Sequence, residues 1–221
     1  MSSESSSAGS ISRGNITYLP VVPGRIEFSL RVRRYLLEHR PRVIAVELPS
    51  SLEREYQTAI DRIPRMSVIL VADSYSDDEE RATYIPIEPG DPSIEALRTA
   101  RELAAEVVFL EPASHEKPHV NDTYPEPYAI ELIGIERYVE AYRVHPQPRT
   151  PELDAHAAAM AWKLQGADPG ASTCIVLSMN MLDPVLDAMQ IPQEEPPAPR
   201  TRLFGNAELF NSASGLPGRS N

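Results

Sequence analysis

Residues 40–56 read RPRVIAVELPSSLEREY, and this stretch decides the fold class. The turn-forming pair Arg-Pro precedes an apolar run, residues 43–46, that is rich in β-branched side chains. A short apolar run bounded by turn residues is typical of a buried parallel strand. The run stops at Glu47, and residues 50–56 then have the polar pattern of a surface helix. We therefore expect a strand followed directly by a helix, which is the repeating unit of an α/β protein.

The same alternation recurs on both sides of this stretch. Predicted strands cover residues 15–22, 43–46, 66–72, 82–87, 107–110 and 173–177, and predicted helices cover residues 28–39, 50–62, 94–105, 128–142, 152–164 and 181–189. Strands separated mostly by helices indicate a mainly parallel sheet with helices on both faces. We predict a single α/β domain over residues 15–191, with core strands around Val43, Val68, Val108 and Ile175.

The two ends of the chain differ from this domain in composition. Residues 1–14 are rich in serine, and residues 192–221 are rich in proline, glycine and serine. Such segments bury too little apolar surface to offset the entropy of ordering. We therefore predict a disordered N-terminal segment and a disordered tail or linker.

Composition excludes several classes of function. With 21 Lys and Arg against 32 Asp and Glu, the formal net charge is −11, which argues against sequence-independent nucleic-acid binding and against docking on an anionic membrane. The single cysteine, Cys174, lies in an apolar run and cannot form an internal disulfide. No apolar run approaches the roughly 20 residues of a spanning helix, and the polar N-terminus lacks a signal-peptide pattern. We expect a cytoplasmic protein.

Two carboxylates mark the candidate site. Glu47 and Glu111 each end an apolar run, and a proline follows each closely. Open α/β sheets keep their sites at the carboxyl ends of parallel strands, so both residues are expected at one edge and in one cleft. There they could act as an acid–base pair or share a cation, and Arg54 is the nearest arginine that could offset their repulsion. The alternative is that each carboxylate only caps a neighbouring helix.

A possible metal site follows Glu111 in the chain. His115 and His119 formally match the H-E-x-x-H pattern of zinc proteases, which requires a helix to bring both histidines to one face. Pro118 would disrupt that helix, so we interpret the match as chance. The alternative is a loop site for a divalent metal formed by His115, His119 and Asp122. The acidic residues 74–80 lack the ligand spacing and glycine of a calcium loop and are interpreted as a solvated loop.

Three stretches resemble one superfamily of proteins. They are residues 40–56, residues 84–112 (YIPIEPGDPSIEALRTARELAAEVVFLEP), and residues 155–165 (AHAAAMAWKLQ) with the following run STCIVLSMNML. The superfamily includes the TraB pheromone-shutdown proteins, the Tiki proteases, the ChaN-like haem-binding proteins and the erythromycin esterases. The closest resemblance is to its uncharacterised bacterial proteins, often encoded beside MoxR-type AAA ATPases. The resemblance implies an ancestral hydrolase fold.

The departures from this superfamily bear on function. Its catalytic members carry Gly-x-x-His after the first strand, where residues 19–24 read LPVVPG, and many carry a second after the last strand, where residues 178–181 read SMNM. Only Glu47, with Arg54, matches the family pattern. A metal-activated water needs several ligands on one centre.

Three functions are compatible with the resemblance and its departures. The first is a diverged, non-catalytic domain that is regulatory or binds a partner protein, with an AAA ATPase module as the partner that the family suggests. The second is a metal-dependent hydrolase of peptidase or esterase type, with a rearranged site of Glu47, Glu111, His115 and His119. A haem- or small-ligand-binding module is a third, by family analogy alone.

Overall fold

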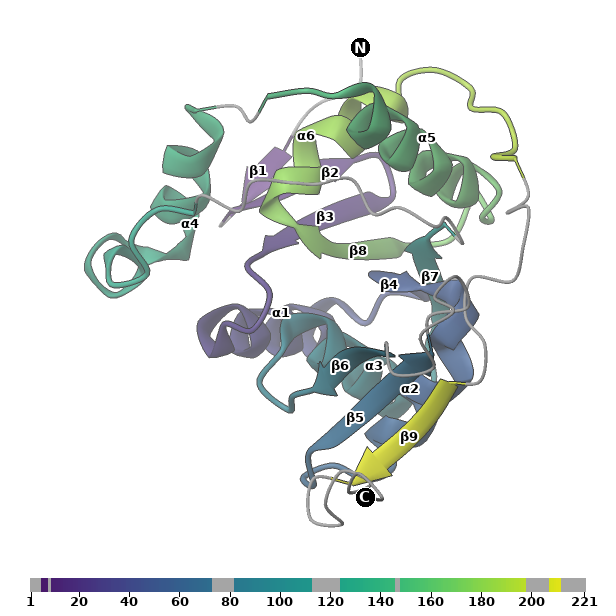
Figure 1. The fold of residues 1–221 in the computed structure, drawn as a ribbon. Coiled ribbons are helices and arrows are strands. Elements are labelled where there is room, and N and C mark those ends of the chain that lie inside the picture. Colours follow the sequence, from purple (N-terminus) through teal and green to yellow (C-terminus); the bar gives the residue numbers. More distant parts are fainter. Residues whose placement is uncertain are drawn as a thin grey trace.

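A six-stranded sheet lies at the centre of the molecule, with strand order β1-β2-β3-β8-β4-β7 (Figure 1). Its strands are β1 (Ser5–Ser7), β2 (Ser10–Arg13), β3 (Ile16–Val21), β8 (Thr173–Ser178), β4 (Val43–Pro49) and β7 (Glu106–Glu111). The last four are mutually parallel, and β1 and β2 join antiparallel at the β3 edge. The computed structural model describes residues 5–7, 9–72, 82–112, 124–145, 148–197 and 207–211. The α/β class with a mainly parallel sheet is confirmed.

Helices cover both faces of this sheet, as predicted. The helices α1 (Ile26–His39), α2 (Glu53–Ile60) and α3 (Pro92–Leu103) lie on one face, and α5 (Pro151–Gln165) and α6 (Met179–Ala188) lie on the other (Figure 1). The run at residues 43–46 is buried throughout because alternate side chains enter the two cores. Ile44 and Val46 pack in the core beside α1 and α3, whereas Ala45 packs in the core beside α5 and α6.

Local sequence signals set the helix starts. The side chain of Asp91 accepts hydrogen bonds from the N–H groups of Ser93 and Ile94, at 2.8 and 3.2 Å, and so caps α3. Thr150 caps α5 in the same way through the N–H of Leu153. In both helices a proline occupies the first turn, where its missing N–H is not needed.

A second, three-stranded sheet corrects one prediction. The strands β5 (Ser67–Ala72), β6 (Ala82–Ile87) and β9 (Ala207–Asn211) form an antiparallel sheet in the order β6-β5-β9, apart from the six-stranded sheet. Its buried Ile69 and Val71 join the core of α2 and α3. The strand around Val68 is therefore not part of the central sheet, and Val68 is only half-buried. An apolar run predicts a strand, but it does not identify the strand with which it pairs.

Both ends of the chain contribute strands. The strands β1 and β2 lie within residues 1–14, and β9 lies within residues 192–221. The predicted disorder therefore does not extend to these three strands. The physical reason is that β2 and β9 pair through their backbones with β3 and β5, which low apolar content does not prevent.

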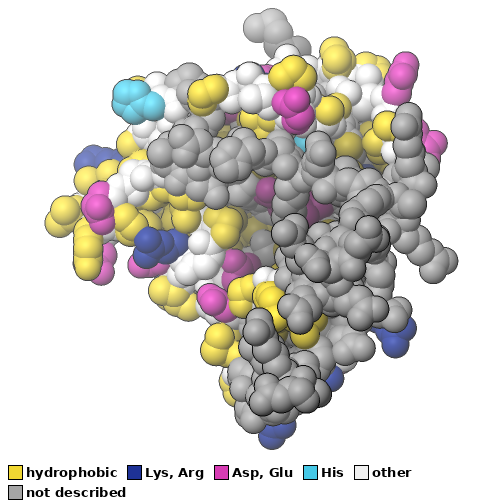
Figure 2. All heavy atoms as spheres, in the orientation of Figure 1, with side chains coloured by type: hydrophobic (Ala, Val, Ile, Leu, Met, Phe, Trp, Pro, Cys, Tyr) yellow, Lys and Arg dark blue, Asp and Glu magenta, His cyan; other side chains and the backbone are white. Residues whose placement is uncertain are grey.

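The helix α4 (Ala129–Arg143) is interrupted at Gly134, where φ is 81° and ψ is 162°. After this break Tyr138 packs edge-on against Phe28 of α1, with ring centroids 6.1 Å apart. Before it, Leu132 is 85% exposed. A continuous helix over residues 128–142 predicts that Ile130, Ile133 and Val139 face inward, but Ile133 is 40% exposed because the break at Gly134 interrupts the helical periodicity. Hydrophobic, acidic and basic side chains lie together over α4 at the left edge of Figure 2.

No helix in the described part of the chain combines the length and apolar character needed to cross a bilayer.

Candidate functional site

The carboxyl edge of the parallel strands carries the polar groups from which we build the site. The strands β4 and β7 are parallel neighbours, and Pro49 lies opposite Glu111 in their register after a bulge that begins at Val46. Glu47 and Glu111 thus lie at the same edge of the sheet, on adjacent strands, as the sequence predicts. Their catalytic roles and their common cleft stay predictions.

The two carboxylates have different neighbours. Ala45 packs in the core beside α5 and α6, whereas Phe109 packs in the core beside α2 and α3. Side chains alternate along a strand, so Glu111 follows the direction of Phe109. On β4 the register shift between Val46 and Pro49 interrupts this alternation, so the surroundings of Glu47 are described from its own hydrogen bonds.

Glu47 is bonded to the end of the adjacent strand β8. Its Oε2 accepts hydrogen bonds from the backbone N–H of Ser178 at 2.6 Å and from the Ser178 hydroxyl at 2.7 Å. Ser178 is the last residue of β8 and the N-cap of α6, where a negative charge also interacts favourably with the helix dipole. Glu47 therefore supports the start of α6, rather than that of the helix that follows β4.

Lys163 of α5 is the cation at the end of β7. Its Nζ donates to the backbone oxygens of Phe109 at 3.0 Å and Glu111 at 2.9 Å, and to Oγ of Ser50 at 3.1 Å. An ammonium group has three N–H donors, so these three partners use all of them. Burial lowers the pKa of Lys163, and the negative charges of Glu111 and Glu53 oppose that shift. Lys163 thus joins the end of β7 to the 3-10 turn η1 (Ser50–Leu52), which follows β4.

Glu111 lies in a buried environment beside α2. It is 4% exposed, and the ring of Tyr56 on α2 lies 6.1 Å from that of Phe109. Burial raises the pKa of Tyr56, and the negative charge of Glu111 raises it further. Arg54 is exposed on α2, and its predicted role of offsetting the charge of the two carboxylates stays a prediction. Arg54 is exposed because of helical periodicity, since Tyr56 takes the buried face of this short helix.

Lys163 and Ser178 are not among the site residues that the sequence predicts. Lys163 stands in an alanine-rich helix between Trp162 and Leu164, and a lone lysine among core residues was the signal. Ser178 follows the apolar strand and opens a helix, which is the position where serine commonly caps. Neither signal names the partner, because Ser178 and Glu47 are 131 residues apart in the sequence.

The predicted metal ligands His115, His119 and Asp122 lie outside the described residues, as does the acidic stretch 74–80. In the described ranges, no three His, Cys, Asp or Glu side chains lie close enough together to hold a metal ion. The groups present at the strand ends do not fit a divalent cation, since the ammonium of Lys163 already binds the carbonyl groups there and would repel it.

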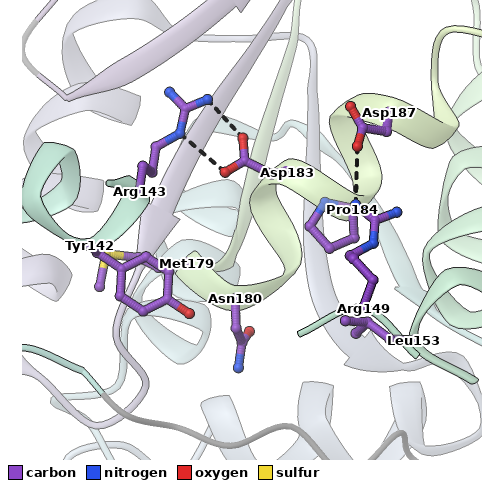
Figure 3. A pocket seen from close by; sticks show the side chains of 9 residues that line it. All are labelled: Tyr142, Arg143, Arg149, Leu153, Met179, Asn180, Asp183, Pro184 and Asp187. Carbon is purple, nitrogen blue, oxygen red and sulfur yellow. Dashed lines mark hydrogen bonds and ion pairs between the residues drawn. The ribbon is translucent and has the colours of Figure 1, made fainter. Parts of the chain in front are cut away.

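A pocket of about 310 Å³ lies between α4, α5 and α6 (Figure 3). Its lining consists of Tyr142, Arg143, Arg149, Leu153, Met179, Asn180, Asp183, Pro184 and Asp187. Arg143 pairs with Asp183 at 2.7 Å and Arg149 with Asp187 at 3.0 Å, so α6 neutralises both arginines. The pocket thus offers no excess charge to an ionic ligand.

No protein-family model, curated protein or solved structure matches this chain. The resemblance to the TraB and Tiki superfamily stays a prediction.

Proposed function

We propose that this chain is a non-catalytic domain that acts by binding a partner protein. The observation that carries the proposal is the engagement of the charged groups at the carboxyl edge. Glu47 holds Ser178 at the end of β8, and Lys163 holds two carbonyl oxygens at the end of β7. These charges connect strand ends to one another and to the neighbouring helix, which is a structural task.

The same engagement is unfavourable for catalysis. A general base needs a lone pair within reach of the substrate proton, and the Oε2 of Glu47 already accepts two short hydrogen bonds. Lys163 has no lone pair while its three N–H groups donate, so it cannot act as a base or nucleophile in this arrangement.

Exposed apolar side chains support a binding role. Tyr128 and Leu132 at the start of α4 are 73% and 85% exposed, and Ile133 adjoins them. Isolated surface hydrophobics are common, but a group of them on one helical turn is typical of an interaction site. A partner-binding domain is also what the superfamily resemblance suggests for a member without the family's histidines, with an AAA ATPase module as the proposed partner.

The alternative is a metal-dependent hydrolase of peptidase or esterase type. The observation in its favour is that Glu47 and Glu111 end adjacent parallel strands at one edge, where α/β enzymes place their sites.

Elemental analysis of the purified chain, combined with ester and peptide hydrolysis assays, distinguishes the two functions. We expect less than 0.1 equivalent of any divalent metal, no hydrolysis above buffer, and no change in either measurement in Glu47→Gln. The matched control is Glu102→Gln, which removes a surface carboxylate. Stoichiometric metal and hydrolysis that are both lost in Glu47→Gln and Glu111→Gln, but kept in Glu102→Gln, would overturn the proposal.

A further inference from the structure

We propose that the first turn of α4 is the docking surface for a basic amphipathic helix of another protein. This inference rests on the proposed binding function and names the surface and the chemistry of its partner. We define the α4 surface as Tyr128, Leu132 and Ile133 together with the carboxylates Glu126 and Glu131.

The apolar part of the α4 surface has the spacing of a helix-binding site. Tyr128 and Leu132 are four residues apart, so they lie one above the other on one side of the helical turn. Ile133 extends the apolar area next to Leu132. Ile130 of the same turn is buried in the core with Phe28 and Tyr138, whereas Tyr128, Leu132 and Ile133 are exposed to solvent. A bound helix could therefore contact the turn without disturbing the Phe28–Tyr138 packing.

The rim of this surface is acidic. Glu126 precedes Tyr128 and Glu131 precedes Leu132, and both carboxylates are exposed. Further along α4, Glu140 is also exposed. The arginines nearby are Arg137, on α4, and Arg25, whose charge acts on Tyr138. Exposed carboxylates next to an apolar turn are complementary to a helix that carries Leu-type residues on one face and Lys or Arg beside them.

The net charge of the whole chain also favours a basic partner. With a net charge of −11, two copies of this chain repel each other, and so do this chain and an anionic membrane. A basic partner is attracted over a distance of about one Debye length, roughly 8–10 Å at physiological salt. The small area of the surface predicts a weak, transient complex rather than a permanent one.

Fluorescence anisotropy with synthetic helices tests this inference on the full chain. The probe is an 18-residue labelled amphipathic helix with leucine on one face and lysine on the other. Matched controls are a peptide with glutamate in place of lysine and a scrambled lysine–leucine peptide without an apolar face. We expect micromolar binding of the basic amphipathic helix and at least tenfold weaker binding of both controls.

Variants of the chain locate the binding site. We expect Tyr128→Ser with Leu132→Ser to weaken binding at least tenfold, and Glu126→Gln with Glu131→Gln to weaken it severalfold and to reduce its dependence on salt. Ile191→Ser, which removes a 62% exposed apolar side chain elsewhere, is the matched control and should bind like the wild type. Circular dichroism melting curves confirm that each variant is folded.

Three results would overturn this inference. They are no binding of the basic helix, equal binding of the acidic helix, and unchanged binding by the Tyr128 and Leu132 variant. Sedimentation showing dimers that this variant abolishes would instead identify a second copy as the occupant. A failure of the proposed function would be seen in other measurements, as bound metal and hydrolysis. The peptide-binding experiments do not depend on those two measurements, so the two failures can be told apart.

Discussion

Glu47 on β4 accepts two hydrogen bonds from Ser178 at the end of β8, one from its N–H at 2.6 Å and one from its hydroxyl at 2.7 Å. The two residues are 131 positions apart in the sequence. A single carboxylate thereby joins β4 to the neighbouring strand β8 and to the N-cap of α6. The residue that most attracts a catalytic interpretation in the sequence has a structural partner in the fold.

A double-mutant cycle tests this relationship. We expect Glu47→Ala and Ser178→Ala each to destabilise the chain, because a hydrogen bond to a charged group contributes about 1.5–3 kcal/mol. The double variant should lose less than the sum of the two, with a coupling of roughly 0.5–3 kcal/mol in urea unfolding. Ser178→Ala keeps the backbone N–H, so additive losses would show that the hydrogen bond from the Ser178 hydroxyl to Glu47 does not stabilise the fold. Ser51→Ala, at an exposed serine, serves as the control.

A second prediction concerns the contribution of Lys163 to stability at the same edge of the sheet. Lys163→Met keeps most of the side-chain volume but leaves the carbonyl oxygens of Phe109 and Glu111 without their donor. We expect a loss of about 2–4 kcal/mol in chemical unfolding, since an unsatisfied buried polar group costs about 1–3 kcal/mol. Arg54→Met, at an exposed basic residue on α2, should stay within about 0.5 kcal/mol of the wild type. Equal effects of the two variants would contradict a stabilising role of the hydrogen bonds from Lys163 to the two carbonyl oxygens.

A substitution at Val46 tests whether β4 is a core strand of the sheet. It is fully buried, with parallel strands on both sides. Val46→Asp should abolish the cooperative melting transition, because an unpaired buried charge costs several kcal/mol. Val144→Asp, at a 71% exposed valine, is the matched substitution and should melt like the wild type. An unchanged melting curve of Val46→Asp would show that β4 is not the core strand.

The raised pKa of Tyr56 predicts that the stability of the fold depends on pH in the alkaline range. Its folded pKa is raised by burial and by Glu111, so its contribution to stability is fully present below the ordinary tyrosine value of about 10. As the pH rises from there through the folded pKa, the unfolded phenol loses its proton first and the folded state loses stability. The loss from this one group reaches at most about 1.4 kcal/mol per pH unit.

Tyr56→Phe removes that loss, so urea unfolding between pH 9 and about 11.5 should show a shallower decline than in the wild type. A remaining decline is expected, because burial also raises the pKa of Tyr18 and Tyr138. Parallel curves for the variant and the wild type would contradict the assignment to Tyr56.

The strand β9 makes the tail part of the fold. Removing residues 198–221 deletes the partner that pairs with Ser67–Val71 of β5. We expect faster hydrogen exchange of β5 amides and a loss of about 2 kcal/mol, from net contributions of about 0.5–1.5 kcal/mol per hydrogen bond. Removing only residues 212–221 keeps β9 and should change neither measurement. If the longer truncation also changes neither, the tail is dispensable, as its composition predicts.

The sequence by itself determined the fold class and most element positions. Apolar runs bounded by turn residues predicted the strands at residues 43–46, 107–110 and 173–177, because burial on both faces requires uninterrupted apolar side chains. The strand-end positions of Glu47 and Glu111 followed from the same runs. These are local properties, since each depends on the order of a few neighbouring residues.

The tertiary structure alone decided which elements pair and which polar groups meet. It placed the strand around Val68 in a second sheet, paired β9 with β5, and brought Lys163 and Ser178 to the two strand ends. It also turned Ile133 outward at the break in α4. Backbone pairing and long-range hydrogen bonds depend on the arrangement of segments more than 100 residues apart, on which local hydrophobic periodicity carries no information.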